Sequence, residues 1–526
     1  MRIIVLLICL LSATPIFAQE VKAQFCPKPV TLMANPKNVS RMLPVTCKLM
    51  KDKDGNYYGI FSENGGAPYS LFKFNNTFDI ISKIKIAESG SPVGFLLNGD
   101  QVILIMYGPG STPGGASISA GPLDKSGKIK ATPLFSGKPS GKYNILIPFI
   151  RYSPGNTTVC VMLEEYAMDQ KPVHNAMVAY SFGADLKIIS QGNIIPGDFE
   201  EVPGPKGFFE PNLNGYTNEP AHASFLDGAV TDQGTIYFCF AAQSSAKDSK
   251  AGKKDDYMKL VQITNSDVTV LDDVIKEKDV KYGKLAVSGE DCFLASLSGE
   301  DAKSSNALCL TKISNGAVAW QKFFNYDVSL APDKNSEKLF DKDGDAKNMR
   351  LKSLQISDNG NLVANVENEY VEEKTSPNVT TESYVTNTDY VFTCSADGET
   401  ASQFMFPKSQ NCYFSDLVSN QLCVSGNHLV MIYNDKKENH GMSYDDRKST
   451  HLHVIGEGFE ITAMSNVGDG KVNISYLSPF GTTGLMNIQA CKTGPNEYIL
   501  FTADWKVSGL VETQTNLKLM RLTLNP

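Results

Sequence analysis

The stretch that decides the fold is residues 94–107, GFLLNGDQVILIMY. Two apolar runs, 94–97 and 102–107, are separated by an Asn-Gly-Asp turn, and asparagine and glycine readily adopt the positive φ angles of a tight hairpin. The second run has no polar face, which indicates a strand buried on both sides. The stretch therefore predicts a hairpin packed between two neighbouring sheets.

A buried strand, a polar connection and a second strand recur eight times along the chain. The first strands start 44 to 77 residues apart and are expected at Tyr57–Phe61, Gln101–Tyr107, Val159–Leu163, Ile236–Ala241, Cys292–Leu297, Leu362–Val366, Leu429–Tyr433 and Tyr498–Ala503. The second strands are expected at Tyr69–Phe74, Ala116–Ala120, Ala176–Phe182, Tyr257–Ile263, Ala307–Ile313, Asp389–Cys394, His451–Ile455 and Leu517–Leu522. Flanking apolar stretches usually add an inner and an outer strand, which is typical of a β-propeller blade.

The protein is therefore predicted to be all-β, with a single β-propeller domain over residues 19–526. Eight blades are favoured, and seven is the alternative if one unit is an extension of another. The last unit lacks an outer strand, because the chain ends at Pro526. We expect an amino-terminal strand, with Val30–Met33 as the candidate, to pair with the carboxy-terminal strands and close the ring, which would hide the free sheet edges.

The first 18 residues have the pattern of a secretory signal peptide. Arg2 precedes the short apolar run Ile3–Leu11, and Ala18 is a suitable cleavage position. No later stretch is long and apolar enough to predict a transmembrane segment. We therefore expect an exported protein of the periplasm or cell surface. Its net charge of −8 is dispersed, which argues against a nucleic-acid partner.

Cysteine usage fits an exported protein, because an oxidising compartment permits disulfides. The candidate pairs are Cys292 with Cys309 on neighbouring strands, Cys412 with Cys423 across a short turn, and Cys26 with Cys47 in the amino-terminal segment. The alternative is that cysteines in the same strand of successive units, such as Cys160 and Cys239, are small apolar residues that pack between blades.

Several long connections differ strongly between the units and are candidates for binding. Those between paired main strands include loops at 243–256, 369–388 and 436–450. Long variable loops on a rigid scaffold are a common place for binding, although any one of them can be an insertion without a role. A further connection carries Phe208, Phe209 and Tyr216, and the sequence predicts a contact loop there.

Metal and catalytic motifs are few. Asp341, Asp343 and Asp345 could hold Ca²⁺ through carboxylate oxygens, but the EF-hand pattern fails and a solvated acidic turn is the competing interpretation. His440, His451 and His453 could bind a transition metal or simply occupy exposed positions near a loop. The nucleophile, zinc-protease and P-loop motifs are absent from the sequence. No catalytic residue or other cofactor is therefore predicted.

Some phrases of the chain resemble exported β-propeller proteins of the Bacteroidetes envelope. They are the FAQ ending of the signal at 17–19, LQISDNGNLVANVENEY at 354–370, LVMIYND at 429–435 and NEYILF at 496–501. The resemblance covers chiefly residues 350–526 and transfers no catalytic residue. It implies that the protein could be an accessory subunit of an outer-membrane assembly, such as the type IX secretion apparatus.

Taken with the compartment, these features predict an exported, non-catalytic binding or scaffold protein. A rigid ring would fix the geometry, and the loops on one face would bind a protein partner in the envelope. The alternative is a carbohydrate-binding or carbohydrate-active propeller. An enzyme of that kind would need two acids facing each other at the central funnel.

Overall fold

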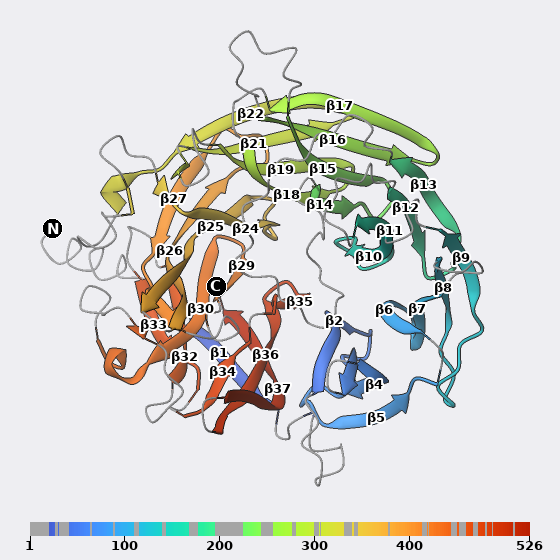
Figure 1. Cartoon of the computed structure of the whole chain (residues 1–526), viewed down its shortest axis with the longest axis horizontal. Coiled ribbons are helices and arrows are strands. Elements are labelled where there is room, and N and C mark those ends of the chain that lie inside the picture. The colour runs from blue at the N-terminus through green and yellow to red at the C-terminus, as the bar shows by residue number, and fades with distance from the viewer. Residues whose placement is uncertain are drawn as a thin grey trace, which may run out of the picture.

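The computed structural model consists almost entirely of β-strands arranged in a ring (Figure 1). It describes residues 20–26, 30, 42–63, 66–87, 90–109, 115–138, 144–167, 177–194, 225–243, 256–275, 280–298, 304–305, 307–330, 339–340, 346–376, 379–412, 418, 420–442, 450–451, 459–466, 472–478, 481–486, 488–508 and 511–525. The helical elements of the described residues include η2 (Val328–Leu330) and η4 (Lys437–Asn439), both 3-10 helices. Among these residues no helix has the length and apolar character needed to cross a membrane.

The strands form eight blades, whose principal strands pair antiparallel and follow the chain from the inside of the ring outward (Figure 1); in blade eight the outer strand is β1, from the start of the chain. Blades one to four are β2 (Met42–Lys51), β3 (Tyr57–Glu63), β4 (Gly66–Phe74) and β5 (Ile80–Lys85); β6 (Ser91–Asn98), β7 (Gln101–Pro109), β8 (Ala116–Pro122) and β9 (Thr132–Gly137); β10 (Asn144–Tyr152), β11 (Thr158–Ala167), β12 (Met177–Gly183) and β13 (Ile188–Ile194); and β14 (Phe225–Val230), β15 (Ile236–Gln243), β16 (Asp256–Thr264) and β17 (Asp267–Ile275).

Blades five to eight follow the same plan, with additional strands in blades six and eight. Blade five comprises β18 (Val280–Ser288), β19 (Asp291–Ser298), β21 (Ala307–Ser314) and β22 (Ala317–Asn325), and blade seven comprises β29 (Asn420–Ser425), β30 (His428–Lys436), β32 (Phe459–Asn466) and β33 (Val472–Tyr476). Blade six comprises β24 (Met349–Ile356), β25 (Leu362–Ser376), β26 (Val379–Cys394) and β27 (Ala401–Phe406), with β28 (Gln410–Cys412) and β31 (Thr450–His451) added at the side. Blade eight comprises β34 (Thr483–Leu485), β35 (Cys491–Gly494), β36 (Glu497–Ser508), β37 (Val511–Asn525) and β1 (Glu20–Phe25). The short strands β20 (Ser304–Ser305) and β23 (Ala346–Lys347) pair with each other.

The predicted β-propeller is confirmed, and so are all eight of the expected first strands. One second strand is wrong: β30 pairs with β32 (Phe459–Asn466) and not with His451–Ile455. The first seven residues of β32 are buried, whereas His451 lies in β31, which joins the sheet of blade six. The residues 452–458 lie outside the described part of the chain.

The ring is closed by its two ends, as predicted, but a different segment does it. The strand β1 pairs antiparallel with β37 over its whole length. Val21, Ala23 and Phe25 pack against the apolar cluster between blades seven and eight, so the alternation of β1 suits an outer strand. Val30 is instead buried between blades eight and one, and the remainder of the expected strand lies outside the described residues.

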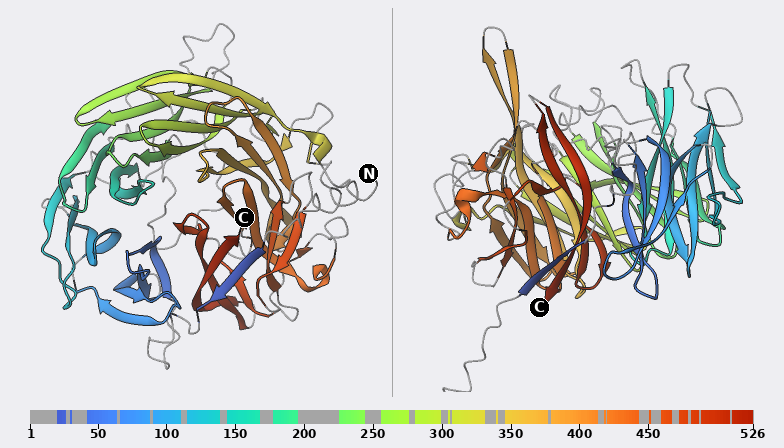
Figure 2. Two further views of the ribbon diagram at one scale, coloured as in Figure 1. Left: turned by 180° about the vertical axis from the view of Figure 1, so that it is seen from behind. Right: turned by 90° about the horizontal axis from the view of Figure 1, so that it is seen from below.

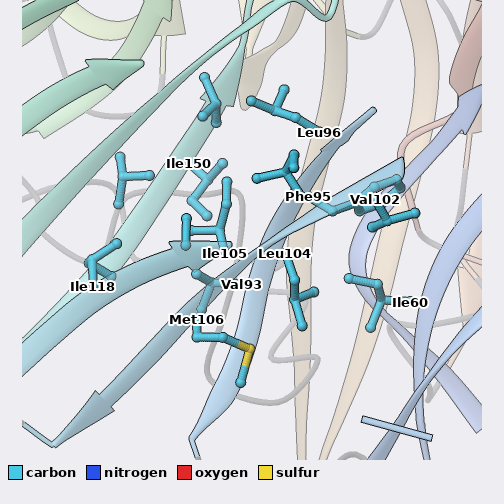
Figure 3. Packing of buried hydrophobic residues seen from close by; sticks show 14 of the residues in the cluster. Ile60, Val93, Phe95, Leu96, Val102, Leu104, Ile105, Met106, Ile118 and Ile150 are labelled. Carbon is cyan, nitrogen blue, oxygen red and sulfur yellow. The ribbon is translucent and has the colours of Figure 1, made fainter. Parts of the chain in front are cut away.

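Apolar side chains fill the seams between blades. Figure 3 shows the cluster that joins blades one to three, in which Phe95, Leu104 and Ile105 are fully buried. The stretch 94–107 thus forms β6 and β7 as predicted, and Gly99 has the positive φ of 59° that their turn requires. The apolar run on β7 faces both neighbouring blades, which explains why it has no polar side.

The antiparallel order of the strands separates the connections onto two faces of the ring. Counted from the inside of each blade, the turns that join the innermost strand to the next one, and the third strand to the outermost one, emerge on one face, which we call the turn face. Connections between the two middle strands of a blade, such as β3 and β4, and those from one blade to the next emerge on the opposite face, which we call the loop face. All the long connections singled out in the sequence belong to this second class, so any binding by them would occur on the loop face.

Candidate functional site

The most distinctive described feature of the loop face is the long hairpin of blade six. The strands β25 and β26 have 15 and 16 residues, and they rise above the ring (Figure 2). The sequence suggested a loop at 369–388, but this segment is largely a continuous antiparallel pair that runs up to Ser376 and Val379. We call the described part that extends beyond the ring, residues 370–376 and 379–385, the ribbon.

A β-bulge separates the ribbon from the blade. Glu367 pairs with Asp389, and the next registered pair is Glu369 with Thr386, so two residues of β26 oppose the single residue Asn368. The Asn368 amide is buried and donates to the carbonyl of Lys347, 2.5 Å away. The bulge thereby gathers several polar side chains at the base of the ribbon.

Six charged side chains meet at this base, and we call them the charged cluster. They are Arg350 and Lys352 on β24, Glu367 and Glu369 on β25, Asp389 on β26, and Lys408 in the segment before β28. Three of them are cations and three are carboxylates, so opposite charges balance within the cluster.

Each carboxylate pairs with one or two of the cations. Glu369 accepts from Arg350 at 2.7 Å and from Lys352 at 3.0 Å. Glu367 contacts Lys352 at 3.2 Å and forms an ion pair with Lys408, whose ammonium also lies 3.4 Å from Asp389. These pairs link three strands of blade six to the segment that leads to β28.

Blade seven contributes to the same cluster through Asn420, at the start of its inner strand β29. The Asn420 side-chain amide donates to Glu367 at 2.9 Å and to both oxygens of Asp389, at 2.7 and 2.9 Å. One amide therefore holds the two carboxylates together across the seam between blades six and seven.

A chain of hydrogen bonds continues from the charged cluster into blade eight. Lys408 donates to Thr386, which donates to Gln410, and the Gln410 amide donates to the backbone carbonyl of Asn434. The Asn434 side chain then exchanges two hydrogen bonds with the backbone of Leu485, of 2.7 and 3.0 Å. Three blades are thus connected by polar contacts near the loop face.

Burial controls the protonation of the cluster. The side chains of Asp389, Lys408 and Glu367 are 0%, 1% and 3% exposed. Burial raises the pKa of Asp389 to about 7, and the nearby Glu367 carboxylate adds to the rise although Lys408 opposes it. Burial also acts to raise the pKa of Glu369, but Lys352 and Arg350 hold it below its usual value.

This geometry favours a structural role for the two paired acids. Glu367 and Asp389 face each other, as the acids of a glycosidase do, but Lys408 and Asn420 bridge them and solvent does not reach them. A substrate could touch them only if the seam opened. Sequence reasoning missed this cluster, although the carboxylates directly after the apolar run 362–366 were a usable signal.

A second polar group lies on the loop face of blade seven. His440, just after η4, contacts the buried carboxylate of Glu460 at 2.7 Å through Nδ1 and stacks on the ring of Tyr476, with 4.1 Å between centroids. The His440 side chain is 57% exposed. His451 lies in β31, and His453 is outside the described residues, so a shared histidine metal site stays a hypothesis.

The predicted contact loop and calcium site lie outside the described residues. This applies to Phe208, Phe209 and Tyr216, and to Asp341, Asp343 and Asp345. Another acidic group, formed by Asp52, Asp54 and Asp100, lies within the described chain. Asp52 accepts two backbone hydrogen bonds of its own turn, from Asp54 at 2.9 Å and Asn56 at 2.8 Å, and it pairs with Lys73 at 3.4 Å. These contacts account for the position of the Asp52 carboxylate in its turn, and no metal is needed to explain it.

The structure does not bring the candidate cysteine pairs together as disulfides. Cys292 lies opposite Ile313, and Cys309 lies opposite Ser296, so these two cysteines are out of register on their neighbouring strands. Cys412 and Cys423 belong to the sheets of blades six and seven, respectively. Cys26 donates its thiol hydrogen to the carbonyl of Phe78, and the side chain of Cys47 is outside the described part. The described cysteines pack as buried thiols.

Comparison with known proteins leaves the function open. No family model and no curated protein matches the chain. Solved structures that are similar include a prolyl endopeptidase (10% identity, TM-score 0.38, 89% of this chain and 55% of that one). The propeller domain of the Trilobed protease from Pyrococcus furiosus is 8% identical, with a TM-score of 0.35 and coverage of 84% and 97%. The α-L-arabinofuranosidase of Fusarium graminearum is 9% identical, with a TM-score of 0.31 and coverage of 95% and 96%.

Proposed function

We propose that this chain is an exported, non-catalytic binding protein that presents its loop face to a protein partner, with the ribbon as a principal contact. The observation that supports the proposal is a contrast at the base of blade six. The three carboxylates and Lys408 of the charged cluster are buried and the charges of the cluster are paired with one another, whereas Tyr370 and Val371, directly above it, are 36% and 40% exposed. Exposed apolar side chains on a projecting element are suited to binding.

The charged cluster would serve this function by fixing the ribbon to the ring. Arg350 and Lys352 hold Glu369, the last residue of β25 before the ribbon, while Lys408 and Asn420 hold the residues below it. A contact element attached at several points loses less conformational freedom on binding than a flexible loop does. The resemblance to Bacteroidetes envelope proteins supports an accessory role in an outer-membrane assembly, with the type IX secretion apparatus as one example.

A carbohydrate-active propeller is the second function to be tested. Glu367 and Asp389 are an acid pair near the loop face, and their burial and their contacts with Lys408 and Asn420 disfavour a catalytic role. Activity towards polysaccharides that persists in a Glu367→Gln variant would mean that any hydrolysis uses other acids. Binding of glycans without hydrolysis would support a carbohydrate-binding subunit.

The experiment that tests the protein-binding function is capture of the tagged chain from its native envelope in mild detergent. We expect a stoichiometric partner, which the double variant Tyr370→Ser with Val371→Ser should lose. The matched control is Val268→Ser with Val270→Ser, because these side chains on β17 are similarly exposed, at 40% and 47%, but lie on an outer strand of blade four. A protein that is captured alone, or a partner lost equally in both variants, would contradict the proposal.

A further inference from the structure

The ribbon has an open backbone edge on the side of β25. The inner strand β24 pairs with β25 only as far as Met349 with Asn368, and one more backbone bond, from Glu369 to Asn348, ends the contact. Among the described strands, none pairs with β25 beyond that point. The segment from Tyr370 to Ser376 therefore carries a row of backbone groups that its ribbon partner β26 can satisfy only on one side.

The opposite side of the ribbon already shows that this sheet accepts additional strands. The strand β28 pairs with β26 at Tyr384–Thr386, and β31 pairs in turn with β28. Among the described strands, blade six therefore forms the widest sheet, with six strands. This widening reaches only the base of the ribbon, because β28 pairs no further than Tyr384 among the described residues.

Two strands alone make a weak structure in water. An isolated antiparallel hairpin is marginally stable, and a third strand or an apolar face is usually needed. The ribbon's described side chains supply little burial on β25, since Tyr370 and Val371 are both exposed. The ribbon sequence also contains three glutamates and one lysine, so its formal charge is negative. A partner that adds backbone bonds and positive charge would correct both deficits.

We propose that an extended, basic segment of a partner protein adds to the ribbon as a further strand, along the edge of β25 from Tyr370 to Ser376. The charge of the partner follows from the composition of the ribbon, which has three acidic residues, Glu372, Glu373 and Glu382, and one basic residue, Lys374. Main-chain hydrogen bonds would provide affinity, and lysine or arginine alternating with apolar residues would provide specificity. This inference rests on the proposed protein-binding function and specifies how the ribbon performs it.

The test uses the full chain and a short synthetic peptide that alternates lysine with valine. Hydrogen exchange should show protection of the amides of residues 370–376 when this peptide is added, because added strand pairing satisfies those groups. A peptide that alternates glutamate with valine should give no protection. The double variant Glu372→Lys with Glu373→Lys should weaken binding by about tenfold or more, because the attraction becomes repulsion.

A matched charge change elsewhere provides the control. Asp267→Lys with Glu399→Lys makes the same change in net charge at exposed positions of β17 and of the turn between β26 and β27, and it should leave peptide binding unchanged. Equal binding of the acidic peptide, absence of protection at 370–376, or equal loss in both double variants would overturn the inference. If the native partner still depends on Tyr370 and Val371 in the capture experiment, only the strand-addition mode fails; if it does not, the proposed function fails as well.

Discussion

Two regions of the same ring are held together by different interactions: the seams among blades one to three, and the seam between blades six and seven. The seams among blades one to three contain a large apolar cluster, with Leu104 and Ile105 fully buried. The seam between blades six and seven has a smaller apolar cluster and, near the loop face, the charged cluster with Asn420. Apolar packing is non-directional and insensitive to pH, whereas buried charges require particular partners and respond to protons. The charged seam lies where the ribbon leaves the ring, so the more specific contact occurs where orientation matters for binding.

The largest expected effect is the loss of a cation from the charged seam. Lys408→Met should lower the free energy of unfolding by about 3–5 kcal/mol, because the buried Asp389 would lose its ammonium partner and Glu367 would keep only Lys352. Urea titration measures the change. The control is Lys187→Met, which removes an ion pair to Asp185 with side chains 84% and 60% exposed, and it should cost at most about 0.5 kcal/mol. Equal effects of the two variants would mean that the charged seam has no special importance.

An apolar seam should respond to truncation with a comparable or somewhat smaller loss that does not depend on pH. Leu104→Ala removes buried methyl groups from the cluster of Figure 3 and should cost roughly 3 kcal/mol. Titrations at two pH values should give the same difference from the parent protein. A difference that changes with pH would show that the two seams are coupled.

The smallest expected effect distinguishes the two seams by protonation. The folded pKa of Asp389, about 7, lies above the ordinary value of 3.8, so the folded chain takes up a proton as the pH falls through 7 while the unfolded chain does not. Asp389 should therefore make the protein more stable by about 1.4 kcal/mol on going from about pH 8 to about pH 6. The variant Asp389→Asn should lose this increment in urea titrations at the two pH values. An increment that survives in the variant would assign the titration to another group.

The blades were predictable because their signals are local. A buried strand is recognisable from its apolar run, and a turn from residues such as Gly99, so the ring follows from repetition of one short pattern. The same local reasoning failed at the second strand of blade seven. There the apolar run after His451 competed with Phe459–Asn466, and only pairing with β30 decides between them.

The sequence by itself determined the class of fold, the repeat and the closure of the ring by its ends, since each depends on patterns within short stretches. Only the tertiary structure decided which segment closes the ring, because pairing of β1 with β37 joins opposite ends of the chain. It also decided the candidate site. Its residues lie far apart in the sequence: they are Arg350, Glu367, Asp389, Lys408 and Asn420. They come into contact only through strand register, a β-bulge and the packing of one blade on the next. No local pattern carries that information, since ion pairs between distant residues leave no periodicity in the sequence.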